Sequence, residues 1–252
     1  MADRQHGSLV VDIVGDFMLE RRLAAADVAA TRPLFAGADV AIANLDTVLS
    51  DRGAPVPKWA NLRGPRECAH DLRAMGIDVV ALANNHAMDF RAEGMLDTCR
   101  ALAAAGVRHA GAGADLAAAS APAVIETPNG TLAVLSIAGT LPPESAAGPA
   151  SPGIAPLHVR YAFAVDDALL PEQPGTVPEV WTELNESDVA RVRRDVAAAR
   201  SLAGAVVVVV HWGVPAQWRA PAHPVLQQYQ RRLGRVLIDA GAEAVLGNHA
   251  HE

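Results

Sequence analysis

The segment DVVALANNHAMD, residues 78–89, joins a short apolar run directly to amide, imidazole and carboxylate side chains. An apolar run of this length that is rich in valine is typical of a buried strand. Four further runs have the same form, namely LVVDIVG ending at Gly15, ADVAIANL ending at Leu45, AVVVVV ending at Val210 and AEAVLG ending at Gly247. We therefore expect five buried strands, each followed by polar residues.

Segments with helical periodicity lie between several of these strands. They are Pro65–Met75, Arg91–Ala105, Ser187–Leu202 and Pro224–Ala240. This alternation predicts an α/β fold whose strands are mostly parallel. A hairpin is also expected, because Ala123–Thr127 and Thr131–Ile137 flank the turn sequence Pro128-Asn129-Gly130. The sheet is therefore expected to be mixed.

The length of 252 residues, with 51% hydrophobic and 19% charged residues, predicts one compact domain over residues 1–252. Residues 140–186 interrupt the regular pattern and contain eight of the 17 prolines. A long irregular segment inside a compact domain is usually functional or a linker. We expect either a lid or substrate loop here, or an inert insertion.

Composition excludes several classes of protein. A net charge of −7 without a basic run gives no source for the attraction that nucleic-acid binding needs. The longest wholly apolar run, Ala205–Val210, is too short to cross a bilayer, so membrane insertion is not expected. The polar amino-terminal residues lack a signal-peptide pattern, and the two cysteines lack a C-x-x-C spacing. These features predict a cytoplasmic protein.

Side chains that can bind metal follow the predicted strands. They are Asp16, Asp46, Asn85, His86, His211, His249 and His251. Ligands bind at the carboxyl ends of strands in α/β sheets, so we expect these groups to converge on one rim of one sheet. Each residue alone also has an ordinary interpretation: a turn or helix cap for the aspartates and Asn85, and a hydrogen-bonded core histidine for His86.

The chemistry of this set predicts a metal centre. Carboxylate, amide and imidazole donors without a thiolate suit Mn, Fe, Zn or Mg, and Asp46 is the candidate to bridge two such ions. A dinuclear centre of this kind predicts phosphoester hydrolysis. Lys58 and Arg63 follow the second strand and are candidates to bind an anionic substrate, although both could be solvated loop charges.

The ordered motifs of the chain resemble one family. Gly15-Asp16, Asn44-Leu45-Asp46, LANNHAMD at 82–89, HWG at 211–213 and GAEAVLGNHAH at 241–251 look like the capsule-biosynthesis protein A (CapA) family of the calcineurin-like metallophosphoesterase superfamily. The resemblance implies a four-layer α/β/β/α sandwich that holds two divalent metal ions.

The resemblance also implies a role for each site residue. Asp16 and His251 would bind the first metal, Asp46 would bridge both, and Asn85, His211 and His249 would bind the second. His86 would assist the leaving group, and Asp89 would orient His86. Asp89 could instead cap the helix that begins at Arg91.

Two positions depart from the family pattern. Asp46 stands where the family usually has glutamate, and Arg91 stands where it usually has glycine. If the backbone at position 91 needs a positive φ, arginine is strained there. Family members also continue past the second histidine, so we expect the carboxyl-terminal part of the family fold to be missing.

The predicted function is a CapA-like metal-dependent phosphoesterase that acts on a small anionic or phosphorylated substrate. Two alternatives remain open. The first is a subunit of poly-γ-glutamate capsule biosynthesis or export, and the second is a non-catalytic scaffold with a degenerate metal site. The sequence contains no indication of oligomeric state.

Overall fold

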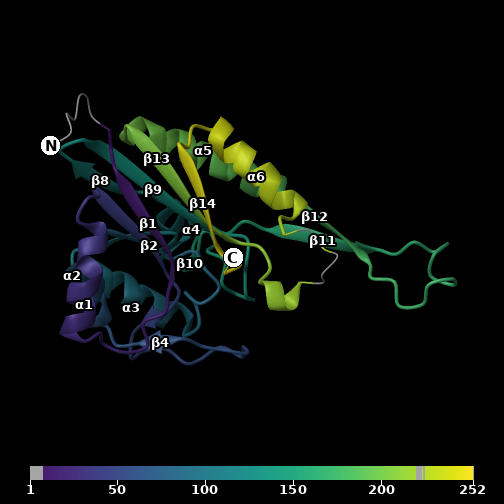
Figure 1. Cartoon of the computed structure of the whole chain (residues 1–252), viewed down its shortest axis with the longest axis horizontal. Helices are drawn as coiled ribbons and strands as arrows, with labels where there is room; N and C mark the ends of the chain where they lie inside the picture. Colours follow the sequence, from purple (N-terminus) through teal and green to yellow (C-terminus); the bar gives the residue numbers. More distant parts are fainter. Residues whose placement is uncertain (1–7, 220–222, 224, 252) are drawn as a thin grey trace.

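A computed structural model describes residues 8–219, 223 and 225–251 (Figure 1). Its first sheet has four parallel strands in the order β1-β2-β5-β6. These strands are β1 (Val11–Phe17), β2 (Val40–Leu45), β5 (Val79–Ala81) and β6 (Arg108–Ala110). Every residue of β2 is buried, which explains its continuous apolar sequence.

The second sheet also has four strands, in the order β14-β13-β9-β8. They are β8 (Ala123–Thr127), β9 (Gly130–Ala138), β13 (Ala205–Trp212) and β14 (Ala244–His249). The hairpin β8–β9 is antiparallel and confirms the turn expected at Pro128-Asn129, while β13 pairs in parallel with both of its neighbours. This sheet is mixed, as expected.

Helices cover the two sheets on opposite sides of the molecule (Figure 1). On the first sheet lie α1 (Ala25–Thr31), α2 (Cys68–Met75) and α3 (Arg91–Ala104). The second sheet is covered by α5 (Glu186–Leu202) and α6 (Gln228–Asp239), and the short helix α4 (Leu116–Ser120) contacts β9. These elements confirm the predicted α/β class.

Side chains that alternate along the strands fill three apolar clusters. Along β13, Val206, Val208 and Val210 belong to the cluster that includes Leu233 and Leu237 of α6. The intervening Val207 and Val209 join Val40, Ile42 and Val79 of the first sheet in a separate cluster. A third cluster packs α2 and α3 on the first sheet. Because each buried aliphatic side chain contributes about 1.5–3 kcal/mol, the contact between the sheets is a major source of stability.

The structure differs from the expectations from sequence in three respects. The five predicted strands belong to two sheets instead of one, because long-range pairing, which periodicity does not show, assigns each strand to its sheet. Helix α2 begins at Cys68, three residues after Pro65, and α6 begins at Gln228. Pro224, where that helix was expected to begin, lies outside the described residues.

The proline-rich segment is more ordered than expected. Besides the short strand β10 (Gly153–Ile154), it contains β11 (Val159–Ala164) and β12 (Glu179–Leu184), which pair in antiparallel register from Val159–Leu184 to Ala164–Glu179. This hairpin extends far from the body of the protein (Figure 1). We call residues 159–184 the arm.

Short elements complete the described chain. They are the paired strands β3 (Val48–Leu49) and β4 (Arg63–Gly64), the strand β7 (Ala112–Gly113) that pairs with β10, and the 3-10 helices η1 (Arg32–Phe35) and η2 (Ala216–Trp218). Cys68 and Cys99 are both free thiols. Among the described residues, none of the helices combines the length and apolar character that crossing a membrane requires.

Arg91 begins α3 with a φ of 60°, in the left-handed region. The sequence singled out this position because its family relatives usually carry glycine there. The left-handed conformation costs an L-residue roughly 1–2 kcal/mol, and glycine adopts it without this cost. No described residue bonds the Arg91 side chain, so nothing in its surroundings offsets the strain.

We expect Arg91→Gly to raise the free energy of unfolding by up to about 1 kcal/mol, since the relief of strain exceeds the added entropy of the unfolded chain. Urea unfolding followed by circular dichroism measures the change. Ala92→Gly, one residue further into the same helix, is the matched control and should destabilise by about 0.5–1 kcal/mol. Destabilisation by both variants would contradict the assignment of strain to Arg91.

Candidate functional site

The carboxyl ends of strands from both sheets lie at one site. Asp16 lies in β1, Asp46 follows β2, and Asn85 and His86 follow β5, all in the first sheet. His211 and His249 lie near the ends of β13 and β14 in the second sheet, and His251 follows two residues later. The predicted residues therefore come from two neighbouring strand rims.

Asp16 connects the two sheets. Its Oδ1 accepts a hydrogen bond of 2.7 Å from Nδ2 of Asn44, which is its neighbour in the first sheet. Its Oδ2 lies 3.0 Å from Nε2 of His251 and accepts a bond of 3.2 Å from the backbone N–H of His249. A single carboxylate thus holds β1 against the end of β14 and the residues that follow it.

His211 occupies the buried centre of the site, with 1% of its side chain exposed. Its Nε2 lies 2.9 Å from Oδ1 of Asn85 and 4.0 Å from Oδ1 of Asp46. The rings of His211 and His249 lie 4.7 Å apart, centroid to centroid. His211 therefore lies against Asp46, Asn85 and His249. The backbone N–H of His249 in turn donates to Asp16.

Burial shifts the pKa values of three side chains at this site. It raises the pKa of Asp46 to about 6, an effect that the nearby Asp16 increases and His86 opposes. Burial lowers the pKa of His211 well below its usual range and that of His249 to about 4. Both imidazoles are therefore neutral at pH 7, which is the form that binds metal.

The donor set fits a divalent cation. Oδ1 of Asp46 is buried and has no hydrogen-bond partner among the described residues, and it lies near the neutral ring of His211. A buried carboxylate without a partner is costly, and a cation compensates it. Within the described residues, no three His, Cys, Asp or Glu side chains form a ready metal-binding group. The donor side chains are present, but in the described part of the chain they are not arranged as a complete set of metal ligands.

A second cluster lies beside these residues and centres on Asp89, whose side chain is 1% exposed. Its Oδ2 lies 2.6 Å from Nδ1 of His86 and accepts a bond of 2.7 Å from the backbone N–H of Leu62. Its Oδ1 accepts a bond of 2.5 Å from Nζ of Lys58. Asp89 thus contacts His86, whereas the cap position of α3 is Phe90. The polar contacts of the His86 ring with described residues are made by Nδ1, to Asp89 Oδ2 and, at 3.1 Å, to Nζ of Lys58.

The two basic residues proposed for substrate binding differ in position. Lys58 also donates to the carbonyl oxygen of Asn85 at 2.6 Å, so its ammonium group lies at the site. The guanidinium of Arg63 donates to the carbonyl oxygens of Arg52 and Gly53 and lies 3.5 Å from the ring centre of Phe90. Arg63 therefore fastens its loop, and substrate binding by either residue stays a prediction.

Asn84 is a site residue that the sequence reasoning did not select. It is 1% exposed, and its Nδ2 donates to the carbonyl oxygen of Leu45 and to Oδ1 of Asn44. Its Oδ1 accepts hydrogen bonds from the backbone of His86 and Ala87. Asn84 therefore fixes the loop that carries Asn85 and His86. The tandem asparagines after β5 were the available signal.

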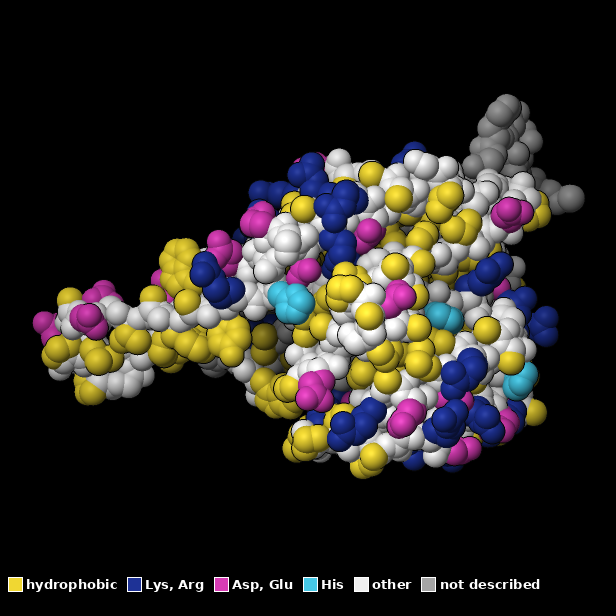
Figure 2. All heavy atoms as spheres, turned by 180° about the vertical axis from the view of Figure 1, so that it is seen from behind, with side chains coloured by type: hydrophobic (Ala, Val, Ile, Leu, Met, Phe, Trp, Pro, Cys, Tyr) yellow, Lys and Arg dark blue, Asp and Glu magenta, His cyan; other side chains and the backbone are white. Residues whose placement is uncertain are grey.

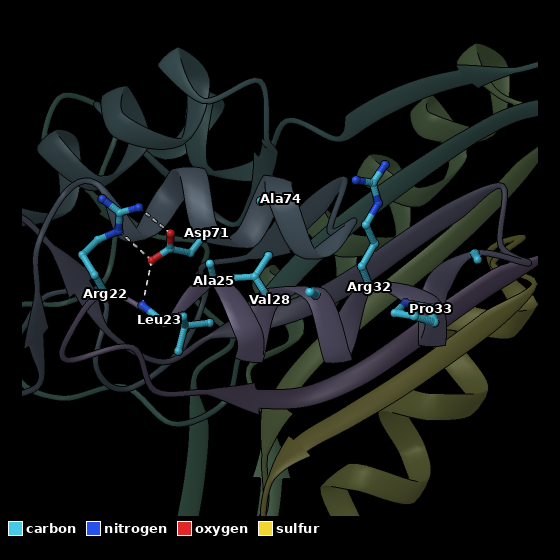
Figure 3. A pocket seen from close by; sticks show the side chains of 10 residues that line it. Arg22, Leu23, Ala25, Val28, Arg32, Pro33, Asp71 and Ala74 are labelled. Atoms are coloured by element: carbon cyan, nitrogen blue, oxygen red, sulfur yellow. Dashed lines mark hydrogen bonds and ion pairs between the residues drawn. The ribbon is translucent and has the colours of Figure 1, made fainter.

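One cavity lies at the site, and another lies elsewhere on the surface. A cavity of about 460 Å³ opens at the site and is lined by Asp16, Trp212 and His249, among other residues. Another, of about 690 Å³, lies between α1 and α2, where Arg22 donates to both carboxylate oxygens of Asp71 (Figure 3). None of the predicted site residues lines this second cavity.

The whole sequence from residue 10 to residue 252 matches one family of proteins, described as bacterial capsule synthesis protein PGA_cap. The chain belongs to this family, and the resemblance to the CapA family noted from its motifs is confirmed.

Three relatives illustrate the similarity. The chain is 31% identical to a probable polyglutamine synthesis accessory protein of Mycobacterium tuberculosis, over 84% of this chain and 50% of the relative. It is 26% identical to the PGA biosynthesis protein CapA of Bacillus subtilis, over 87% and 49%. It is 30% identical to an uncharacterized protein of Sinorhizobium fredii, over 86% and 55%. The chain spans about half the length of these relatives.

We expect Asp46→Asn to stabilise the metal-free protein at pH 7 by on the order of 2 kcal/mol, because the folded state raises the pKa of this carboxyl group above its unfolded value. A raised pKa penalises folding once the group ionises, so the advantage of the variant should shrink as pH falls through 6. It should disappear below about pH 4, where Asp46 is protonated in both states.

Chemical unfolding with a chelator, repeated across this pH range, tests the prediction. Asp51→Asn is the matched control, because the side chain of Asp51 is 80% exposed. A stability difference for Asp46→Asn that does not change with pH would contradict the assignment.

Proposed function

We propose that the chain is a metal-dependent phosphoesterase that holds two divalent cations and hydrolyses a small anionic, phosphorylated substrate. The observation that carries this proposal is the buried Oδ1 of Asp46, which lacks a hydrogen-bond partner among the described residues and lies 4.0 Å from Nε2 of His211.

The contacts support a division of the donors into two groups. Asp16 and His251, which lie 3.0 Å apart, would hold one cation. His211 contacts both Asn85 and His249, and these three residues would hold the other. Asp46 would bridge the two cations. These oxygen and neutral imidazole donors suit Mn, Fe, Zn or Mg.

The cations would supply Lewis-acid stabilisation of the phosphoryl oxygens. The chain itself would supply the proton donor. Asp89 holds Nδ1 of His86 and leaves Nε2 to donate a proton to the leaving oxygen. Lys58 pairs with Asp89 and would also contact an anionic substrate bound there.

We also infer the finer architecture of the superfamily, a four-layer α/β/β/α sandwich. The support is the composition of the three apolar clusters, which join helices to the first sheet, the first sheet to the second, and the second sheet to helices. This arrangement would present both strand rims at one edge, where the proposed metal site lies.

A second candidate function is a role in the assembly or export of a poly-γ-glutamate capsule. The observation that favours it is the naming of the relatives, which includes a PGA biosynthesis protein and a probable polyglutamine synthesis accessory protein. Metal binding without turnover of phosphate esters would favour this function or a scaffold over the phosphoesterase.

We expect Mn²⁺ to raise the melting temperature of the chain, because a ligand that binds only the folded state stabilises it by about 2.7 kcal/mol at one hundred times its Kd. His211→Ala should remove most of the shift. The control His70→Ala changes an exposed histidine of α2 and should keep it. Equal shifts for the two variants, measured by differential scanning fluorimetry and checked by elemental analysis, would exclude the proposed donor set.

We expect His86→Asn to lower kcat by about 10² to 10⁴-fold, the usual contribution of a general acid, while the Mn²⁺-dependent shift in melting temperature remains. p-Nitrophenyl phosphate and bis(p-nitrophenyl) phosphate, assayed separately, test monoesters and diesters. Turnover equal to that of the unmodified chain would remove His86 from the mechanism. Absence of turnover by the unmodified, metal-loaded chain on both substrates would argue against the phosphoesterase.

A further inference from the structure

The arm, residues 159–184, contacts the body near its base, where the backbone N–H of Tyr229 donates to Oγ1 of Thr182 and Nε2 of His223 lies 3.1 Å from the carbonyl oxygen of Pro178. Its strands β11 and β12 pair only with each other among the described strands. The loop 165–178 carries the hairpin still further from the body (Figure 1). An isolated two-stranded hairpin is marginally stable in water. A surface that packs against the arm would therefore stabilise it.

Large apolar side chains are exposed along the arm. Tyr161 is 67% exposed, Phe163 66% and Trp181 50%, and Leu169 and Leu170 in the loop are each 45% exposed. Seen from behind, apolar side chains run along the length of the arm (Figure 2). Exposed apolar surface concentrated on one projecting element is typical of an interaction site.

The arm is also acidic. It contains five acidic residues, Asp166, Asp167, Glu172, Glu179 and Glu183, and a single basic one, Arg160, which pairs with Glu183. The other four carboxylates have no ion pair with a described residue. An acidic apolar element favours a partner that is basic and partly apolar. It disfavours the anionic surface of a membrane.

The outer face of α5 and α6 has the complementary character. These two helices carry seven arginines and four acidic residues, in a chain whose net charge is −7. Four of the arginines are exposed and form no ion pair with a described residue; they are Arg193, Arg194, Arg231 and Arg235. Ile238, one turn beyond Arg235, is 48% exposed and adds apolar surface.

The positions of the arm and α6 suit reciprocal pairing. Helix α6 begins beside the base of the arm, where the backbone N–H of Tyr229 donates to Oγ1 of Thr182. From this base α6 runs back along the body, while the arm runs away from it (Figure 1). A two-fold axis near the base would therefore lay each arm along α6 of the other copy, the self-complementary contact of a symmetric dimer.

We propose that the arm is a self-association element that packs on the basic face of α5 and α6 in a second copy of the chain. A standard interface uses about 20–30 residues from each partner, and residues 159–184 provide a surface of that size. This inference is independent of the proposed phosphoesterase activity.

Sedimentation velocity of the 252-residue chain tests the proposal, starting in the low micromolar range. We expect a dimer whose dissociation constant rises with salt concentration, because charged contacts are screened. In a shortened-arm variant, an Asn-Gly turn replaces residues 165–178 and joins the paired residues Ala164 and Glu179. This variant should be monomeric, and circular dichroism should show that it is folded.

Charge reversal tests the docking face. The triple variant Asp166→Lys, Asp167→Lys, Glu172→Lys and the double variant Arg231→Glu, Arg235→Glu should each raise the dissociation constant at least about tenfold. Combining all five substitutions in one chain should restore much of the dimer. The controls Glu126→Lys and Arg108→Glu change exposed residues of β8 and β6 and should have no effect.

Three outcomes would overturn the proposal. They are a monomer at every concentration, a dimer that survives shortening of the arm, and a dimer insensitive to both sets of charge reversals, which would exclude α5 and α6 as the docking face. A monomer that binds anionic lipid vesicles through the arm would assign the surface to membranes instead.

Discussion

The contact between the inner faces of the two four-stranded sheets determines where every other part of the molecule lies. Val207 and Val209 of β13 meet Val40 and Ile42 of β2 in this contact. The opposite faces of the same strands are covered by helices, so β2 and β13 are buried on both sides. Because the two sheets are fixed together, their carboxyl ends form one shared edge, and the polar residues at these ends become neighbours.

This arrangement explains the unusual electrostatics of the site. Three of the groups at this edge are buried deeply enough for burial to be the largest influence on their pKa. Burial keeps His211 and His249 neutral and raises the pKa of Asp46 to about 6. Lys58 and the backbone N–H of Leu62 donate hydrogen bonds to the carboxylate of Asp89. The site therefore contains one carboxylate, Asp89, that pairs with a basic side chain. It contains another, Asp46, with a buried oxygen that has no hydrogen-bond partner among the described residues.

Sequence reasoning predicted the longer strands and helices of the body, because these have clear periodicity, but it missed β6 and α1. It did not predict how the strands divide between two sheets, since that depends on contacts between distant residues. It also missed the hairpin of the arm, whose two strands lie in the proline-rich segment. Within the site, Asp89 had two local interpretations, and only the folded chain shows that its carboxylate reaches His86. Asn84 was overlooked because its role is to bond the backbone of its own loop.

The bond from the backbone of His249 to Asp16 joins residues 233 positions apart in sequence. A ribosome that adds about 5–20 residues per second needs roughly 10–50 s to traverse that interval. During this time the first sheet can form, but Asp16 has none of its contacts with the second sheet's histidines. Assembly of the site is therefore a late event in biosynthesis, and the nascent protein cannot acquire its full set of donor groups until β14 has left the ribosome.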